Sequence, residues 1–505
     1  MPYRDLRDWI EALDRAGELH RITAPVDVKL ELSTITDLVS KSGGDSPEHG
    51  PPTTGLSGPG APGGKALLFE NVVDGAKKHD MPVLINQFGS KKRMALSLGV
   101  EDIEQIPREI AKLLEMEPPQ GFIEGIKKLP ELSRLLKMAP VMVRGGRCQE
   151  IVKTGEEARL SEIPVITAWP LDAGPFISLG CVFTRDPQSG KRNVGMYRMQ
   201  VYDETSTGMH WHKHHTGAEH ADRTKRGEKM PVAVAIGTDP AVTFSAVCPL
   251  PPGIDEMLFA GFLRHSHVEM VACRTVPLEV PATAEIVLEG WVDPAELRRE
   301  GPYGDHTGFY SLPDDYPVFR LTAITHRRNP IYATTIVGPP PMEDCWMAHA
   351  IERIFLPLLR KVIPEIVDYH LPFAGVFHNM ALISIRKRYP GHARKVMHAV
   401  WGLGQMIFTK TIVLFDEDVD VHNLSEAAFV ALANIDPERD FEFSFGPSET
   451  LDHASRLLHY GSKVGIDATK KLASEGFTRP WPERQVMDPH VVESVKARWA
   501  ELIKE

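Results

Sequence analysis

The chain has 505 residues, enough for about three domains at roughly 100–200 residues each. Apolar residues make up 42% and charged residues 25%, which excludes a disordered, collagenous or coiled-coil protein. The formal net charge of −11 argues against a general nucleic-acid binder, because phosphate contacts require clustered Lys and Arg. No apolar run approaches the roughly 20 residues of a membrane span, and five scattered cysteines without a CxxC motif favour a reducing compartment, so a cytoplasmic protein is expected.

Residues 1–138 are predicted to form a mixed α/β domain. Apolar residues recur at helical spacing over 6–13 and predict an amphipathic helix that ends near Gly17, which is not the pattern of a signal peptide. A strand is predicted over 66–72. Pro107 is expected in the first turn of a later helix.

The rest of the chain divides into three parts by its predicted secondary structure. Residues 139–335 hold many short β-like runs separated by turn residues, which indicates a barrel. A good helical pattern appears there only over 255–264, with Asp255 as its N-cap. Residues 336–480 return to α/β, and residues 481–505 are predicted to form an amphipathic helical tail that packs on its own chain or on a partner subunit.

The first chemical signal is a histidine cluster between residues 210 and 220. Histidine ligates metals as neutral imidazole and binds phosphate as imidazolium. The alternative is a polar loop that is rich in histidine without further meaning. The cluster consists of His210, His212, His214, His215 and His220.

The second signal is the segment NVGMYR, from Asn193 to Arg198. The rigid fork of Arg198 suits a carboxylate or a phosphate, although an ordinary surface ion pair is the alternative. The two residues are five positions apart, so they face opposite sides of a regular strand. For both to reach one ligand, the strand must bulge or Asn193 must precede it.

The third signal is a pair of carboxylates, Glu300 and Asp305, that bracket a tight Gly/Pro turn. Buried together, two such groups push their pKa values apart, so one can stay protonated as a general acid; the alternative is an ordinary acidic turn. Glu285 and Glu289 alternate on an upstream strand and either join the site or face solvent. Glu256 at the start of the 255–264 helix either favours the helix dipole or serves as a hard-metal ligand.

In their order and joint presence, these segments resemble the UbiD family of prenylated-FMN-dependent (de)carboxylases over most of the chain. The matching stretches include NVGMYRMQV, GMHWHKHHTGAEH, PLPPGIDEMLFAGFLR, EGPYGDHTGFYS and GSKVGIDATKK. The resemblance implies an α+β or α/β fold, with a central split β-barrel flavin-binding domain flanked by N-terminal and C-terminal α/β segments. It also implies prenylated FMN as the cofactor, with its phosphate held through Mn²⁺ (or Mg²⁺) and K⁺.

The resemblance carries over to single residues. Asn193, His214 and Glu256 match the family's metal ligands. Arg198, Glu300 and Asp305 match its catalytic Arg–Glu–acid triad. The cofactor-binding positions that match are Met196, Tyr197, Arg198, His210, Trp211, His212, His215, Thr216 and Lys410.

The implied reaction is a reversible, non-oxidative decarboxylation of an aromatic, heteroaromatic or α,β-unsaturated acid. In the family's mechanism the substrate forms a covalent adduct with the prenylated flavin, CO₂ leaves, and an acid, here Asp305, protonates the same carbon. Donation near neutral pH requires a raised carboxyl pKa. The implied partners are the small acid and CO₂, a flavin prenyltransferase that supplies the cofactor, and further copies of the chain in a dimer or hexamer.

The sequence leaves two alternative functions open. An FMN-dependent oxidoreductase on a similar split barrel would need a nicotinamide-binding segment. The one GxGxxG, at Gly58, Gly60 and Gly63, precedes a strand instead of opening a helix, so it does not supply one. A non-catalytic subunit of a carboxylase complex is the other alternative, although such a subunit could dispense with the intact triad.

Overall fold

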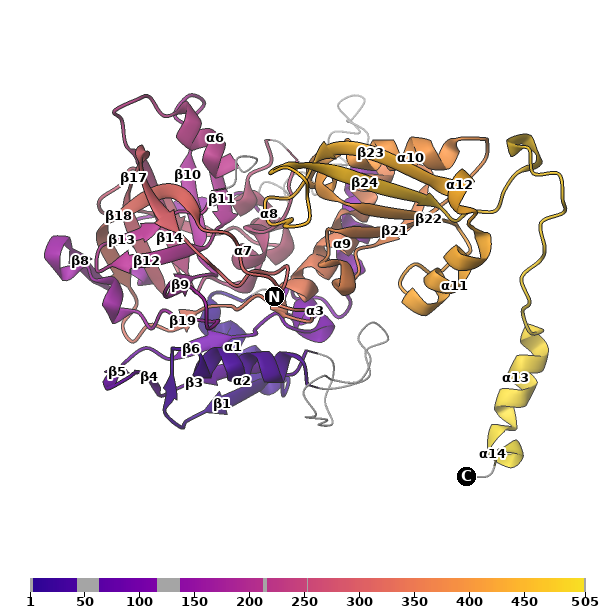
Figure 1. The fold of residues 1–505 in the computed structure, drawn as a ribbon. Helices are drawn as coiled ribbons and strands as arrows, with labels where there is room; N and C mark the ends of the chain where they lie inside the picture. The colour runs from indigo at the N-terminus through magenta and orange to yellow at the C-terminus, as the bar shows by residue number, and fades with distance from the viewer. Residues whose placement is uncertain (1–2, 43–62, 116–136, 212–215, 252, 504–505) are drawn as a thin grey trace, which may run out of the picture.

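The structure is a computed structural model that describes residues 3–42, 63–115, 137–211, 216–251 and 253–503. An N-terminal α/β segment, a curled central sheet and a C-terminal α/β sheet follow one another along the chain, and a helical tail extends from the last of them (Figure 1). The predicted mixed fold around a central barrel-like sheet is confirmed.

The first helix shows how the local sequence sets an element. Helix α1 (Leu6–Arg15) begins at Asp5, whose carboxylate accepts the backbone N–H groups of Arg7 and Asp8. Its apolar stripe is buried, and Gly17 follows with φ +70°, so the predicted end is confirmed. Beyond it the segment contains β1 (Leu19–Ile22), β2 (Val26–Asp27), α2 (Glu31–Ser40), β3 (Ala66–Phe69), β4 (Val72–Asp74), β5 (Lys77–His79), β6 (Val83–Ile85), α3 (Lys91–Ser97) and α4 (Gln105–Glu115).

The predicted elements of this segment agree with the structure in outline. The strand predicted over 66–72 is broken after Phe69, where β3 ends and a turn leads to β4. Pro107 lies in the first turn of α4, as expected. Strand β19 (Tyr332–Ala333) pairs with β6, so the chain returns to this N-terminal sheet after the central sheet is complete.

The central sheet has nine strands in the order β11-β10-β14-β17-β18-β13-β12-β9, with β8 beside β18. Strand β11 is at one end of this order and β12 is near the other, yet only Tyr197 and Arg198 separate them in sequence. The sheet must therefore curl until its ends meet at these two residues, which form the seam of a half-closed barrel. The strands of this region are β7 (Val141–Val143), β8 (Ile151–Thr154), β9 (Phe176–Ile177), β10 (Cys181–Arg185), β11 (Arg192–Met196), β12 (Met199–Asp203), β13 (Ser206–Gly208), β14 (Met230–Ile236), β15 (Glu269–Ala272), β16 (Glu279–Pro281), β17 (Ile286–Glu300) and β18 (Asp314–His326).

The helices of the central region differ in part from the prediction. Helix α8 (Glu256–Arg264) begins at Asp255, which accepts two backbone N–H groups as predicted. Two further helices are present where none was predicted, α6 (Thr216–Arg223) and α7 (Pro240–Ser245). The sequence does contain a start signal for α7, because Asp239 caps it and proline occupies its first position.

Helix α9 (Glu343–Val362) separates the central sheet from the C-terminal sheet (Figure 1). Residues of its first half join an apolar cluster with Phe259 of α8, and residues of its last turns join the core of the C-terminal sheet. That sheet has the order β20-β21-β22-β24-β23. Its elements are β20 (Ile366–His370), β21 (Met380–Ile385), α10 (His392–Trp401), β22 (Thr411–Asp416), α11 (Leu424–Asn434), α12 (Pro437–Asp440), β23 (Phe441–Pro447) and β24 (Tyr460–Asp467).

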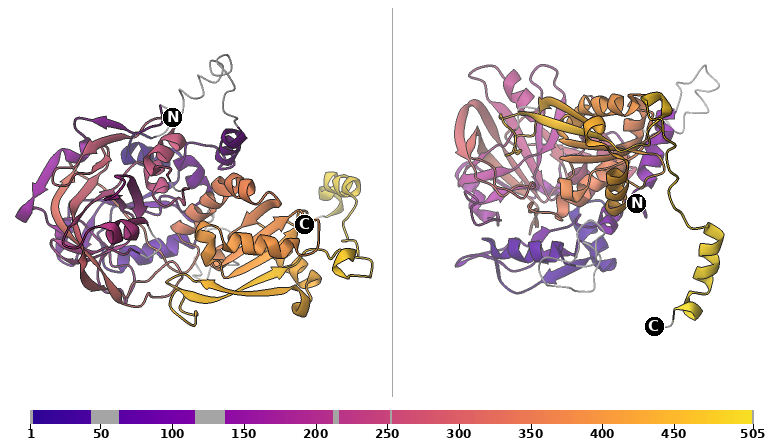
Figure 2. Two further views of the ribbon diagram at one scale, coloured as in Figure 1. Left: turned by 90° about the horizontal axis from the view of Figure 1, so that it is seen from above. Right: turned by 45° about the vertical axis from the view of Figure 1, so that its right-hand side comes forward.

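The tail consists of α13 (Pro489–Ala497) and α14 (Trp499–Leu502), which bury no residue and extend away from the body of the molecule (Figure 2). Packing on its own chain, one of the two predicted arrangements, is therefore not observed. Among the described residues, no helix is both long and apolar enough to cross a bilayer.

Candidate active site

Arg198 occupies the seam of the central sheet and is buried. Its Nε and Nη2 donate to the two carboxylate oxygens of Glu300 at 2.8 and 3.1 Å, which is a bidentate pair. Its Nη1 donates to Asp305, and Nη2 also reaches Ser311 Oγ at 3.0 Å. Strand β11 ends at Met196, so Arg198 does not follow the alternation of side chains along the strand that holds Asn193. The five-residue spacing therefore does not force the two side chains to opposite faces.

The side chains that surround the Arg198–Glu300 pair come from three more places in the fold. Glu300 ends β17 and has no exposed surface. His210 follows β13, and its Nδ1 lies 3.0 Å from the second oxygen of Glu300. The ring of Tyr303 covers the guanidinium, with its centroid 4.6 Å from the guanidinium carbon. The site is therefore a closed polar network in which each charge has a partner.

The turn that carries Asp305 is fixed by its glycines. Gly301 has φ +86°, and its N–H donates to Gln200 Oε1 at 2.8 Å. The N–H of Gly304 donates to Asp172 at 2.7 Å. A Cβ on Gly304 would lie 2.2 Å from a ring carbon of Trp169, so only glycine fits there. The loop before β9 thus holds the acid against Arg198.

Both carboxylates are ionised in this geometry, which contradicts the expectation that one is kept protonated. Burial alone would raise the pKa of Glu300, but the hydrogen bond from His210 and the charge of Arg198 lower it to about 2. For Asp305, burial is likewise outweighed, by Arg198 and His306, and its pKa falls below its usual range. The physical reason is that a guanidinium lies between the two acids, so they do not repel one another directly.

Two histidines that no sequence pattern indicated extend this network. Asp305 Oδ1 lies 2.8 Å from Nδ1 of His306, whose Nε2 lies 2.9 Å from Nε2 of His378. Burial opposes protonation of His306, but the hydrogen bond to Asp305 raises its pKa above the usual value. Burial and the neighbouring His306 lower the pKa of His378 to about 4. A proton shared by Asp305 and His306 is therefore next to a neutral imidazole.

His378 lies in the connection between β20 and β21. The series of contacts from Asp305 through His306 to His378 therefore joins the central sheet to the C-terminal sheet. Its Nδ1 is buried and has no hydrogen-bond partner in the described part of the chain. His306 directly follows Asp305 in the sequence and could have been noticed there. No sequence signal connects either residue to His378.

Two of the three expected metal ligands lie side by side. The carboxylate of Glu256 accepts the backbone N–H of Val194 at 3.1 Å, next to Asn193. Burial raises the pKa of Glu256 to about 7. The side-chain nitrogen of Asn193 is buried without a hydrogen-bond partner among the described residues, and the two ends of an amide are interchangeable by rotation. A buried carboxylate that accepts one hydrogen bond, next to an amide whose nitrogen has no partner among the described residues, fits a hard cation. His214 lies outside the described residues.

Some of the expected cofactor positions lie at the seam of the central sheet, and others lie outside the described residues. Met196, Tyr197 and Trp211 line the seam, where the rings of Tyr197 and Trp211 meet edge to face with centroids 6.4 Å apart. The indole nitrogen of Trp211 is buried without a partner in the described structure. Thr216 is the first residue of α6. His212 and His215 lie outside the described residues.

Lys410 directly precedes β22 of the C-terminal sheet and donates to Asp452 at 2.9 Å. The neighbouring His453 ring contacts Phe309, with centroids 4.3 Å apart, so the loop that binds Lys410 also touches the turn of Asp305. Glu285 and Glu289 are fully buried but take no part in this network. Each is instead bound elsewhere: Glu285 by Arg7 and Arg327, and Glu289 by the backbone of Arg274 and Thr275.

Three family models match the chain, and their descriptions are the N-terminal, Rift-related and C-terminal domains of 3-octaprenyl-4-hydroxybenzoate carboxy-lyase. They match residues 10–114, 141–340 and 345–468. The chain belongs to the UbiD family. An uncharacterised protein of Archaeoglobus fulgidus is 45% identical to it over 505 residues, which is 99% of each chain.

Solved structures agree with the UbiD assignment. The vanillic acid decarboxylase of Sedimentibacter hydroxybenzoicus in its closed form is 25% identical, with a TM-score of 0.81 and 100% of each chain covered. An evolved dimeric form of the UbiD-class enzyme HmfF from Pelotomaculum thermopropionicum, in complex with prFMN, is 26% identical, with a TM-score of 0.75 over 97% of this chain and 98% of that one. These similarities support a carboxy-lyase that uses a prenylated flavin.

Proposed function

We propose that this UbiD-family chain is a reversible non-oxidative decarboxylase of an aromatic, heteroaromatic or α,β-unsaturated carboxylic acid. The observation that carries the proposal is the buried Arg198, held between Glu300 and Asp305 at the seam of the central sheet. Loss of CO₂ from an sp² carbon leaves a carbanion that no side chain can stabilise adequately. Prenylated FMN supplies the electron sink when it is bound.

Arg198 is proposed to bind the carboxylate of the substrate. Glu300 holds Nε and Nη2 of the guanidinium, whereas the contact with Asp305 uses only Nη1. A substrate carboxylate can therefore replace Asp305 on Nη1 while Glu300 keeps the fork oriented. This exchange fixes the scissile bond in one direction, which is a positioning effect.

The same exchange prepares the acid. Once the charge of Arg198 is shared with the substrate, the main interaction that lowers the pKa of Asp305 is weakened. His306 Nδ1 then gives its proton to Asp305 Oδ1, over the 2.8 Å that separates them. Asp305 donates this proton to the carbon that CO₂ has left. His378 is in place to exchange a proton with Nε2 of His306.

The proposed metal site consists of Asn193, His214 and Glu256, and holds Mn²⁺ (or Mg²⁺) together with K⁺ at the flavin phosphate. A cation bound there would restore the charge of the buried Glu256 carboxylate, whose pKa burial raises to about 7. The residues proposed to line the cofactor are Met196, Tyr197, Arg198, His210, Trp211, His212, His215, Thr216 and Lys410.

The domain division follows the same proposal. Residues 1–138 and 336–480 are the flanking α/β domains, 139–335 is the flavin-binding barrel, and 481–505 is a tail that joins copies of the chain in a dimer or hexamer. The exposed apolar side chains of the tail, such as Trp499 at 56% exposure, support a role in assembly. A flavin prenyltransferase is the proposed source of the cofactor.

The test compares protein expressed with and without a flavin prenyltransferase. Both samples are assayed for flavin spectrum and for CO₂ release from a panel of aromatic and α,β-unsaturated acids. Turnover that depends on the prenyltransferase, without any added nicotinamide, is expected. Equal turnover in both samples would contradict the use of a prenylated flavin.

A further inference from the structure

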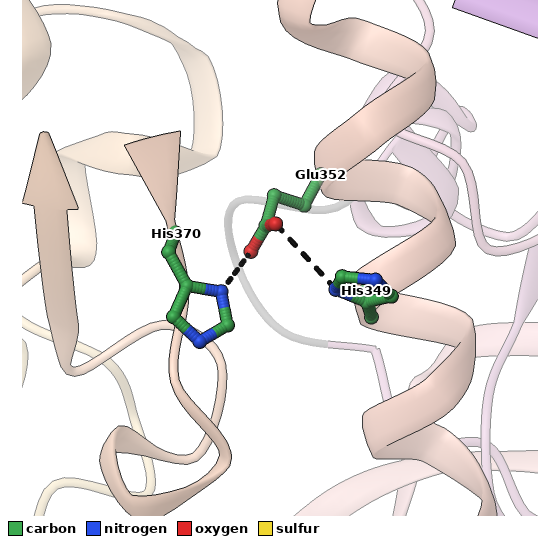
Figure 3. A group of neighbouring side chains, drawn as sticks. All are labelled: His349, Glu352 and His370. Carbon is green, nitrogen blue, oxygen red and sulfur yellow. Dashed lines mark hydrogen bonds and ion pairs between the residues drawn. The ribbon is translucent and has the colours of Figure 1, made fainter. Parts of the chain in front are cut away.

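A second group of titratable side chains, which shares no residue with the Arg198 network, lies where α9 meets the end of β20 (Figure 3). His349 and Glu352 are three residues apart on α9 and therefore share one face of the helix. His370 is the last residue of β20. One ligand atom from each of the three lies within 4.8 Å of the others.

The spacing of these atoms suits a shared cation. His370 Nδ1 lies 3.0 Å from one carboxylate oxygen of Glu352, and His349 Nδ1 lies 3.5 Å from the other. Ligand atoms placed tetrahedrally at about 2.0–2.1 Å from Zn²⁺ are about 3.3–3.4 Å apart. Figure 3 shows both rings turned toward the carboxylate, one from the helix and one from the strand.

The carboxylate has capacity for a ligand. Glu352 is fully buried, and its Oε1 makes no hydrogen bond within the described residues. Its Oε2 accepts from His370 and from the backbone N–H of Leu371 at 2.6 Å.

A third imidazole is within reach. His422, between β22 and α11, has its Nδ1 3.8 Å from Glu352 Oε1, and its ring centroid is 4.7 Å from that of His370. Its Nε2 lies 3.3 Å from Asp368 and 3.1 Å from Arg353. A carboxylate on the far nitrogen is the usual arrangement of a metal-bound histidine. His349 and His422 are also partly exposed, which leaves a path for an ion.

We propose that His349, Glu352 and His370 bind one divalent cation of the Zn²⁺ class, with His422 next to the fourth position. Two imidazole nitrogens and one carboxylate oxygen suit Zn²⁺, whereas Mg²⁺ and Ca²⁺ prefer oxygen ligands. The ion would tie α9, β20 and the β22–α11 connection together. This site shares no residue with the one at Asn193 and Glu256, and it does not depend on the proposed activity.

The competing explanation is a set of imidazole–carboxylate hydrogen bonds without metal. The chain contains a natural control for this explanation. Buried His392 lies 3.1 Å from the carboxylate of Glu365. The other partner of that carboxylate is Lys395 instead of a second imidazole. A pair of this kind is expected to bind no transition metal tightly.

The experiment is a Zn²⁺ titration of tag-free, chelator-treated full-length protein against a chromogenic chelator, with metal content measured by mass spectrometry. Glu256→Gln removes a ligand from the other proposed site. It is expected to keep one Zn²⁺ per chain, and His392→Gln is expected to bind Zn²⁺ like the wild type. Glu352→Gln is expected to weaken this Zn²⁺ by more than about 10-fold.

His349→Ala, which replaces a partly exposed side chain, decides the question if Glu352→Gln does not fold, and circular dichroism checks both. It too is expected to lower the affinity more than about 10-fold. Zn²⁺ binding that is the same in the wild type, Glu352→Gln and His349→Ala would overturn the proposal. So would a wild type that retains no Zn²⁺ against the chelator.

Discussion

Replacing Asp305 by asparagine separates proton donation from cofactor binding. The amide keeps the shape of the carboxylate but cannot deliver a proton, and general acids contribute about 10²–10⁴-fold to rate. The contacts of Asp305 are with Arg198 and His306, and none of Asn193, Glu256 or Lys410 is among them. We therefore expect Asp305→Asn to lose at least about 100-fold in kcat while it retains its flavin.

The stability cost of this substitution can be bounded from the same contacts. Removing one partner of a buried ion pair costs about 3–5 kcal/mol when a charge is left alone. Arg198 keeps its bidentate pair with Glu300 and its bond to Ser311, so it is not left alone. We expect a loss of about 1–3 kcal/mol in the free energy of unfolding, typical of one lost charged hydrogen bond.

The assay measures CO₂ release per bound flavin, and urea unfolding measures stability. Ser311→Ala is the matched control, because it removes the hydroxyl that accepts from Arg198 Nη2 and from the backbone N–H of Tyr303 but leaves the acid in place. It should cost about 1–3 kcal/mol and less than about 10-fold in kcat. An Asp305→Asn protein with full flavin and wild-type turnover would refute the assignment of Asp305 as the acid.

Four further predictions follow from the site. Glu256→Gln should yield protein poor in flavin and in Mn²⁺, and undiminished flavin absorbance and Mn²⁺ content would contradict the ligand assignment. His378→Asn should lower kcat by about 10-fold with KM unchanged and raise the solvent deuterium isotope effect, whereas a change in KM alone would indicate a structural role. Gly304→Ala forces a Cβ against the indole of Trp169 and should lower the free energy of unfolding in urea by about 1–3 kcal/mol. Gly145→Ala, with open space around the added Cβ, should lower it far less. Equal losses in the two variants would show that the contact at Gly304 is not tight. The pKa of Glu300 is depressed to about 2 in the folded state, so its contribution to stability is present above its usual pKa near 4.5 and should be lost as the pH falls from there toward 2. The free energy of unfolding of Glu300→Gln should therefore depend less steeply on pH over this range than that of the wild type.

The features that the sequence predicted correctly depend on signals within a few adjacent residues. Helix α8 begins at Asp255 because a side-chain cap is a property of a few adjacent residues, and Gly17 ends α1 for the same kind of reason. Helix α6 was missed because its eight residues are mostly polar and only three of them are buried, so it contains no run of large apolar side chains that would indicate a helix. Arg198, Glu300 and Asp305 were found because each lies within a short motif, whereas His306 and His378 were missed.

The relations between those motifs were not predictable in the same way. That Tyr197 and Arg198 close the seam follows from the pairing order of distant strands, which no local pattern encodes. The expected pKa separation of the two acids was wrong because it depends on where a third charge, Arg198, lies between them. The contact of His306 with His378 arises only when the C-terminal sheet docks on the central one.

The central claim is that this chain removes CO₂ from an acid held by Arg198. The most direct measurement is the release of labelled CO₂ from carboxyl-labelled aromatic acids by protein loaded with prenylated FMN, with no reduced nicotinamide present. The account predicts release from at least one acid by the wild type and loss of that release in Asp305→Asn at equal flavin content. No release from any acid, together with oxidation of reduced nicotinamide by the FMN-loaded chain, would contradict it and favour an oxidoreductase.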